Sequence, residues 1–352
     1  MISALLFVKG CAFFLYMVKK FLAPILLLLL PFVVVAALSI GVVSVPFSEV
    51  CKVLMVQIGF GDLSMVSEQA LLTIGQLRLP RILMSLLVGG ALAMVGVIFQ
   101  SIFRNPICDP YVLGISSGAS VGAAIAFVLG WDIYWFGVTG AAFLAALLTL
   151  FFLFAMLGRK RNVETQTILL AGVAINFLLS AVITLLVVLN QQGMQKIIFW
   201  TMGSLADSSY IDVAVLFAIL LIVSFFLFYF AKDLNILQLG GNVARTLGVN
   251  VQQVIYLLLI FSSLLIASAV ALSGVIGFIG LIIPNICRLI WGNNVRKLLF
   301  FSMLLGAYFL LGADTLARTI TPHADLPVGC ITALAGAPYF LFLLVRNSKY
   351  KS

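Results

Sequence analysis

The chain has 352 residues, of which 64% are apolar and only 9% are charged, and its formal net charge is +9. A soluble domain carries roughly a quarter charged residues, so a soluble fold of this composition would lack the polar surface that keeps it dispersed. The five cysteines form no CxxC pair and there is one histidine, which argues against a zinc or redox site. The composition therefore indicates a protein whose solvent is the lipid bilayer.

Apolar runs long enough to cross a bilayer, about 20 residues each, recur along nearly the whole chain. They predict an all-α polytopic membrane protein and not a β-barrel, whose strands would alternate over about ten residues. Residues 1–20 are predicted as an N-terminal extension that either lies in the membrane interface or reflects an early start site. A single transmembrane domain then covers 21–346, and 347–352 form a tail. The ten predicted spans are 21–43, 79–100, 112–130, 137–157, 166–189, 211–230, 253–272, 275–291, 298–314 and 327–345.

The basic residues predict the orientation of these spans. With the N-terminus inside and ten spans, fifteen of the twenty Lys and Arg residues fall on the inner side, as the positive-inside rule requires. Both termini are then cytoplasmic, and the net charge needs no nucleic-acid partner. No acidic residue falls in the middle of a predicted span, which argues against a proton-driven carrier. The five outer basic residues are Lys52, Arg78, Arg81, Lys196 and Arg318.

One inner loop, residues 231–253, is too polar to span the membrane and too long for a simple turn. Glycines at 240, 241 and 248 divide it into two short helical pieces, 235–239 and 242–247. A helix–glycine–helix element on the cytoplasmic face suits a docking surface for a soluble partner. An ordinary solvated loop is the alternative interpretation.

Three stretches of the chain resemble one known family. The first, residues 78–124, reads RLPRILMSLLVGGALAMVGVIFQSIFRNPICDPYVLGISSGASVGAA, and the inner loop contributes LGGNVARTLGV. The third begins SGVIGFIGLIIPNICRLIWGNNVRKLL and continues through GADTLAR and DLPVGCITALAGAPYFLFLL. Together they resemble the FecCD family of ABC importer permeases, which serves iron-siderophores, haem and cobalamin, over about residues 30–346. One departure is Pro284–Asn285, where the family usually has Pro-His.

The resemblance implies the type II ABC importer fold, with ten helices per subunit and inverted repeats that relate span 2 to span 7. It implies a second permease subunit, either another copy or a paralogue, two cytoplasmic ATPase subunits and a substrate-binding protein. The chain contains no GxxxxGK[ST] loop, so ATP and Mg are expected in the ATPase. We therefore expect a transport subunit of the bacterial inner membrane that is not an enzyme and has no cofactor or metal of its own.

Three outer arginines, Arg78, Arg81 and Arg318, are candidates for docking the binding protein. The resemblance implies that they face glutamates of that protein, and charge complementarity would set registry and association rate. The alternative is that they anchor the chain at the interface, with their heads in water.

Two inner sites are also implied by the resemblance. Residues Gly240, Gly241, Ala244, Leu247 and Gly248 are expected to form the coupling element that inserts into the ATPase, although glycine also simply ends helices. Thr165 and Gln166 are expected to narrow the cytoplasmic end of the pathway. Thr165 could equally cap the helix that follows.

The predicted function is a permease that forms the pathway for a bulky iron chelate, with a ferric siderophore as the first choice. Haem and cobalamin are the alternatives. A secondary carrier that works alone is disfavoured by the docking loop and by the lack of charges within the spans. An intramembrane enzyme would need a catalytic pair inside the spans, and the sequence offers none.

Overall fold

A computed structural model of the chain describes residues 22, 24–41, 44–60, 66–134, 136–157, 165–320 and 326–348, with the backbone alone at 342–344 and 346–348. Within these residues, ten apolar helices match the ten predicted spans, six of them long and four shorter. The predicted extension 1–20 lies outside the described residues, and so does the tail except for 347–348, which end the last helix. The ten are Pro24–Ser39, α3–η2–α4 (Glu68–Ile102), α5 (Ile115–Val128), α6 (Gly137–Leu157), α7 (Thr165–Leu189), α9 (Tyr210–Tyr229), α12 (Val251–Ser273), α13 (Ile279–Trp291), α14 (Val295–Ile320) and α15 (Val328–Ser348).

Short helices lie between the spans. At the end of the bundle that was predicted to be outside, α2 buries Val50 and Val53 in a small apolar cluster with Ile74 and Leu38. The sequence analysis predicted neither α2 nor α8, because both are too short and too mixed in composition to resemble spans. These elements are α2 (Phe47–Gln57), η3 (Pro110–Leu113), η4 (Trp131–Ile133), α8 (Met194–Thr201), α10 (Ala231–Gln238) and α11 (Gly241–Thr246).

The second span begins earlier than predicted. It starts at Glu68, where the side chain of Ser67 accepts a hydrogen bond from the backbone N–H of Ala70. The helix then passes through a π-helical segment, Leu71–Arg78, before α4 (Leu79–Ile102) continues as regular helix. The predicted start was residue 79, but the wider π turns lie directly in front of Pro80 and the chain stays helical through the proline.

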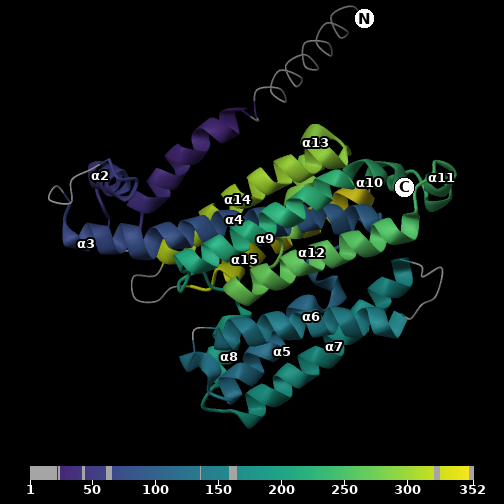
Figure 1. The fold of residues 1–352 in the computed structure, drawn as a ribbon, viewed down its shortest axis with the longest axis horizontal. Coiled ribbons are helices and arrows are strands. Elements are labelled where there is room, and N and C mark those ends of the chain that lie inside the picture. Colours follow the sequence, from purple (N-terminus) through teal and green to yellow (C-terminus); the bar gives the residue numbers. More distant parts are fainter. Residues whose placement is uncertain are drawn as a thin grey trace, which may run out of the picture.

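Helix α4 is the central element of the bundle. In the most apolar 18-residue stretch of this span 83% of the residues are buried, whereas in the corresponding stretch of α7 only 11% are buried. It packs against α9, α12, α13 and α14, and Figure 1 shows it running through the bundle beside them. Glycines allow the closest contacts: a Cβ at Gly96 would collide with the carbonyl oxygen of Gly280, and one at Gly89 with that of Gly306. Small residues let helix backbones approach closely, as is typical of membrane bundles.

The two ends of the bundle carry different elements. Figure 1 shows α2 and α3 at one end and α10 and α11 at the opposite end, while α5, α6, α7 and α8 lie together along one side. The predicted outer and inner elements therefore separate in space. Their absolute orientation in the membrane stays a prediction.

Two short helices support the predicted repeat. Helix α5, the third span, follows Gly114 in the left-handed region, with φ of 84°. Helix α13, the eighth span, follows Phe278, also left-handed, with φ of 70°. Both are shorter than the other internal spans and stand five spans apart, which is what a repeat of five helices requires. The eighth span, predicted to begin at 275, begins instead at Ile279, because residues 274–278 are not helical.

Candidate functional site

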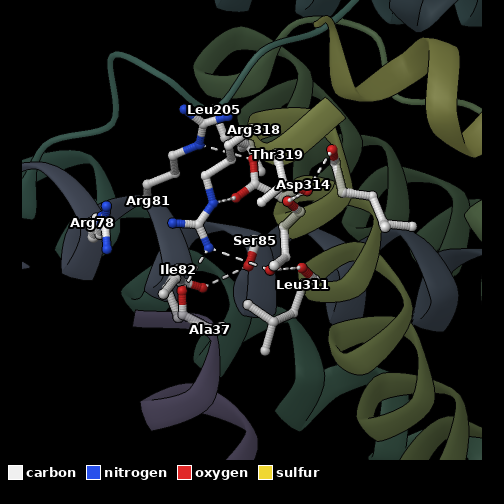
Figure 2. A network of polar contacts seen from close by, with 12 residues as sticks. Ala37, Arg78, Arg81, Ile82, Ser85, Leu205, Leu311, Asp314, Arg318 and Thr319 are labelled. Carbon is white, nitrogen blue, oxygen red and sulfur yellow. Dashed lines mark hydrogen bonds and ion pairs between the residues drawn. The ribbon is translucent and has the colours of Figure 1, made fainter. Parts of the chain in front are cut away.

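The three predicted docking arginines lie at the end of the bundle that carries α2. Nε of Arg81 is 2.8 Å from Oδ1 of Asp314, and Nε of Arg318 is 3.4 Å from Oδ2 of the same carboxylate. Asp314 is fully buried. Figure 2 shows the two guanidinium groups meeting this one carboxylate, with Arg78 apart from them in this view. We call Arg81, Asp314 and Arg318 the outer triad.

Backbone carbonyls supply further partners for these cations. Nη1 of Arg78 donates to the carbonyl oxygen of Leu38 at 2.7 Å, and Nη2 of Arg318 donates to that of Ala37 at 2.9 Å. Both carbonyls belong to the last turn of the helix Pro24–Ser39. The last carbonyls of a helix lack intrahelical partners and carry partial negative charge, so cations stabilise that end. These two hydrogen bonds join the first span to η2, at the start of the second span, and to α14.

The three arginines do not form an exposed rim in this chain. Arg78, Arg81 and Arg318 are 8%, 7% and 5% exposed. The reason is the early start of the second span, which places residues 78–81 more than two turns inside the helix. The alternative expectation, interfacial anchoring with heads in water, fails for the same reason. Whether a binding protein docks above them is a separate question and stays a prediction.

Sequence analysis missed Asp314 as the shared partner. It placed this residue at the outer end of a span, whereas the carboxylate lies inside the bundle, six residues before α14 ends. A signal was present in GADTLAR, because Asp314 and Arg318 stand four residues apart and so share one helix face. The contribution of Arg81, which lies 233 positions away, leaves no such local signal.

The segment predicted as the coupling element folds into two short helices at the opposite end, and its coupling role stays a prediction. Helices α10 and α11 are joined at Gly240, whose φ of 135° is a conformation that side chains rarely adopt, and α11 ends before Gly248, with φ of 84°. Leu239, Val243 and Leu247 are 70%, 43% and 61% exposed. Ala244 is instead fully buried, so it packs α11 against its own subunit and does not face outward.

The predicted gate residues lie beside this element. Thr165 and Gln166 begin α7 and line a pocket of about 470 Å³ together with Arg104, Gly241 and Arg245. The pocket is also lined by residues of α12, so α4, α7, α11 and α12 meet there. Thr165 is the first residue of the helix itself. The structure thus brings the predicted gate and coupling residues together, although neither role is tested by it.

No metal centre is formed by the described part of the chain, where no three His, Cys, Asp or Glu side chains lie close enough to hold an ion. The arrangement at the two sites can form and exchange ion pairs and hydrogen bonds. It offers no nucleophile paired with a base.

Removal of the shared carboxylate should destabilise the fold. In Asp314→Asn the two arginines stay buried but lose their anion, and breaking a buried pair in this way costs about 3–5 kcal/mol. We expect a large drop in the thermal unfolding midpoint of the purified protein in detergent.

Asp132→Asn is the matched control. Asp132 pairs with Lys196 at 2.5 Å, but the lysine is 62% exposed and water screens the pair. The hydrogen bond from Lys196 keeps the pKa of Asp132 below its usual value, so this carboxyl is ionised at neutral pH. Asp132→Asn therefore removes one negative charge, as Asp314→Asn does. Equal drops in the unfolding midpoint for the two variants would contradict a structural role for the outer triad.

Comparison with known proteins identifies the family. Residues 27–346 match the model of the FecCD transport family. The chain is 42% identical over 279 residues to the cobalamin import system permease protein BtuC of Halobacterium salinarum, which covers 79% of this chain and 75% of that protein. It is 42% identical over 275 residues to a probable iron chelatin transport system permease protein of Helicobacter pylori, covering 77% and 82%.

A solved structure has the same fold. It is described as an inward-facing conformation of a putative metal-chelate type ABC transporter, and its chain superposes with a TM-score of 0.79 at 33% identity. The match covers 91% of this chain and 97% of that one. With ten apolar helices, a family match over nearly its whole length and these relatives, the chain belongs to the FecCD transport family, as a multi-pass permease subunit of an ABC importer that is not itself catalytic.

Proposed function

We propose that this permease forms half of the translocation pathway for a bulky iron chelate, a ferric siderophore first of all. The observation that carries the proposal is the separation of two features: a largely covered cationic cluster at one end of the bundle and an exposed apolar helix pair at the other. An importer needs both, because a binding protein docks at one face and an ATPase at the other. The iron chelatin relative and the metal-chelate structure favour the substrate class.

Cobalamin is the second candidate substrate, and the halobacterial relative at 42% identity favours it. Haem is a third. Uptake in a strain that lacks this gene, measured with labelled ferric siderophores, haem and cobalamin, decides between them. Loss of cobalamin uptake alone would refute the iron-chelate proposal.

We further propose that two permease subunits, identical or paralogous, enclose one central pathway above two ATPase subunits, with both termini in the cytoplasm. Helix α7 supports this assembly, since little of its apolar surface is covered within one chain. Thr165 and Gln166, at the start of α7, would then narrow the cytoplasmic end of the pathway. The exposed cations Arg104, Lys232 and Arg245 lie at that same end, which agrees with an inner location.

Docking of the binding protein is proposed for the end that carries Arg78 and the outer triad. Arg81 and Arg318 share one aspartate there and Arg78 lies apart from it, so positive charges exceed negative charges by two among these four side chains. An acidic surface on the partner would be attracted to this excess and steered into register. The partner would respond to the field of the cluster, since the guanidinium groups themselves are largely covered.

Coupling to the ATPase is proposed for α10–α11. The exposed Leu239, Val243 and Leu247 give this element an apolar surface on a face where loops are normally polar, and such patches mark protein–protein contacts. The space around Gly241 is open to a partner, because a Cβ at this position would meet only Nη2 of Arg104, at 3.9 Å.

Leu247→Glu and Gly241→Leu should each prevent the ATPase from binding while the permease still inserts and folds. The first buries a charge in the interface, and the second fills the space that the partner would occupy. Co-purification of the ATPase with the tagged permease is the measurement. Asn293→Glu is the control, because it adds the same charge at an exposed position in the loop between α13 and α14. Normal recovery of ATPase with both variants would show that the element is an ordinary loop.

Arg78→Gln should weaken binding-protein affinity without unfolding the permease. Arg78 donates to the carbonyl of Leu38, so its loss leaves the outer triad intact, whereas reversing all three arginines would surround Asp314 with carboxylates. The expected loss at low salt is at most about fivefold, or about 1 kcal/mol, because the covered Arg78 acts on the partner only through its field and contributes no more than a direct surface ion pair would. It should shrink at physiological salt, where charges are screened over about 8 Å.

Affinity is measured with the reconstituted complex at low and at physiological salt. Lys52→Gln, an exposed cation on α2 at the same end, is the control for a general loss of charge. If Arg78→Gln binds as tightly as the unmodified protein at low salt, this cluster is structural and docking takes place elsewhere.

A further inference from the structure

Helix α13 contains a proline that leaves one of its carbonyls without a regular partner. Pro284 has no N–H, so it cannot donate to the carbonyl of Gly280, four residues earlier. Inside a membrane bundle an unpaired carbonyl costs several kcal/mol, and a neighbouring group normally satisfies it. The question is which group does so here.

Gln100, in the last turn of α4, supplies the missing donor. Its Nε2 lies 3.1 Å from the carbonyl oxygen of Gly280 and 3.2 Å from that of Leu281. The side chain is 3% exposed. The close approach of Gly96 to Gly280, one turn away on α4, brings the two backbones near enough for this side chain to reach across.

The remaining contacts fix the orientation of both amide groups. Nη1 of Arg288 donates to Oε1 of Gln100 and, at 3.3 Å, to Oδ1 of Asn285. Nδ2 of Asn285 donates at 2.8 Å to the carbonyls of both Leu281 and Pro106. Each amide thus turns its oxygen to a cation and its nitrogen to carbonyls, so a flipped amide would lose every contact. We call Gln100, Asn285 and Arg288 the inner clamp.

The same end of α4 is bonded to the proposed coupling element. Nη2 of Arg104 donates at 2.7 Å to the carbonyl of Leu237 in α10, and Nε2 of Gln238 donates at 3.3 Å to Oγ of Ser101. Arg104 has a φ of 49°, unusual for a residue other than glycine, and this bend turns it toward α10. On the far side, Oδ1 of Asn235 accepts from the N–H of Val295 at the start of α14.

We propose that Gln100 is a positioning residue for transport. Its hydrogen bonds make the short helix α13 move together with α10–α11. The connection runs from α10 through Ser101 and Arg104 to the end of α4, and from Gln100 to the carbonyls that Pro284 leaves open. Asn285 extends it to the loop that follows α4. The inference rests on the proposed coupling role of α10–α11, since a movement must enter there.

A rigid connection can be measured without knowing the substrate. Spin labels at Thr246 in α11 and Asn293 after α13, both exposed, report the distance between the two elements in a chain whose five cysteines are replaced. The complex with its ATPase is compared nucleotide-free and trapped with ATP and vanadate. We expect one unchanged distance in both states for the parent, and a shifted distance on trapping for Gln100→Leu.

Two further variants separate positioning from mere stability. Gln100→Glu keeps the size and the contact with Arg288 but loses the donors, so it should shift as Gln100→Leu does. Pro284→Ala restores an N–H that can bond to the carbonyl of Gly280 within α13. The double variant Gln100→Leu/Pro284→Ala should therefore recover thermal stability yet keep the shifted distance. Thr149→Val, which removes a largely buried hydroxyl bonded only within α6, should leave the distance unchanged.

The results can overturn the inference without touching the proposed function. The positioning role of Gln100 is contradicted if the label distance in the parent changes on trapping. It is also contradicted if the Gln100 variants keep the same distance as the parent. Either result would hold even if Leu247→Glu still blocks ATPase binding. If the double variant regains both the thermal stability and the label distance of the parent, Gln100 has only a structural role. Conversely, normal ATPase binding by Leu247→Glu would contradict the proposed coupling role of α10–α11. Any change in the label distance would then have to come from a contact with the ATPase elsewhere on the permease.

Discussion

The hydrocarbon core of a membrane offers no hydrogen-bond partners, so charged side chains and free helix carbonyls inside this bundle need partners within the protein. The outer triad follows from that constraint. Asp314 has no water to hold its charge, and two arginines from different helices take that role. Arg318 and the neighbouring Arg78 in turn donate to the carbonyls of Ala37 and Leu38, which lack intrahelical partners at a helix end. These contacts together involve a carboxylate, three guanidinium groups and a helix terminus.

Helix α4 is where these demands meet. Arg81 near its start belongs to the outer triad, and Gln100, Ser101 and Arg104 at its end bond to α13 and α10. Nineteen residues separate Arg81 from Gln100, which is about 28 Å at 1.5 Å per residue. Its glycines bring α13 and α14 against it closely enough for short side chains to reach across. The proposed docking and coupling ends are thus connected by a single, largely buried helix, which suits an importer whose two partners act on opposite faces.

The sequence predicted what depends on composition and local pattern. All ten spans were expected from apolar length alone, and the two pieces of the coupling element from Gly240, Gly241 and Gly248. What it could not predict depends on pairs that are distant in the chain. Arg81 was placed on the surface because its partner Asp314 lies 233 positions away. The early start at Glu68 was missed because Pro80 is a stronger local signal than the π-helical turn in front of it. Gln100 carried no signal at all, since its importance comes from a proline in another helix.

The departure at Asn285 has a local explanation. An asparagine amide has two donors and one acceptor, and here all are used: two carbonyls accept from it and Arg288 donates to it. A neutral histidine, which the family usually has at this position, offers one donor and one acceptor, so it could serve Arg288 and only one carbonyl. The carbonyl of Leu281 would still be satisfied, because Gln100 also donates to it. Both residues therefore fit the same inner clamp. Asn285 is 9% exposed and its partners are all within α13 and the segment that follows α4, so we interpret the departure as a local change of hydrogen bonding and packing.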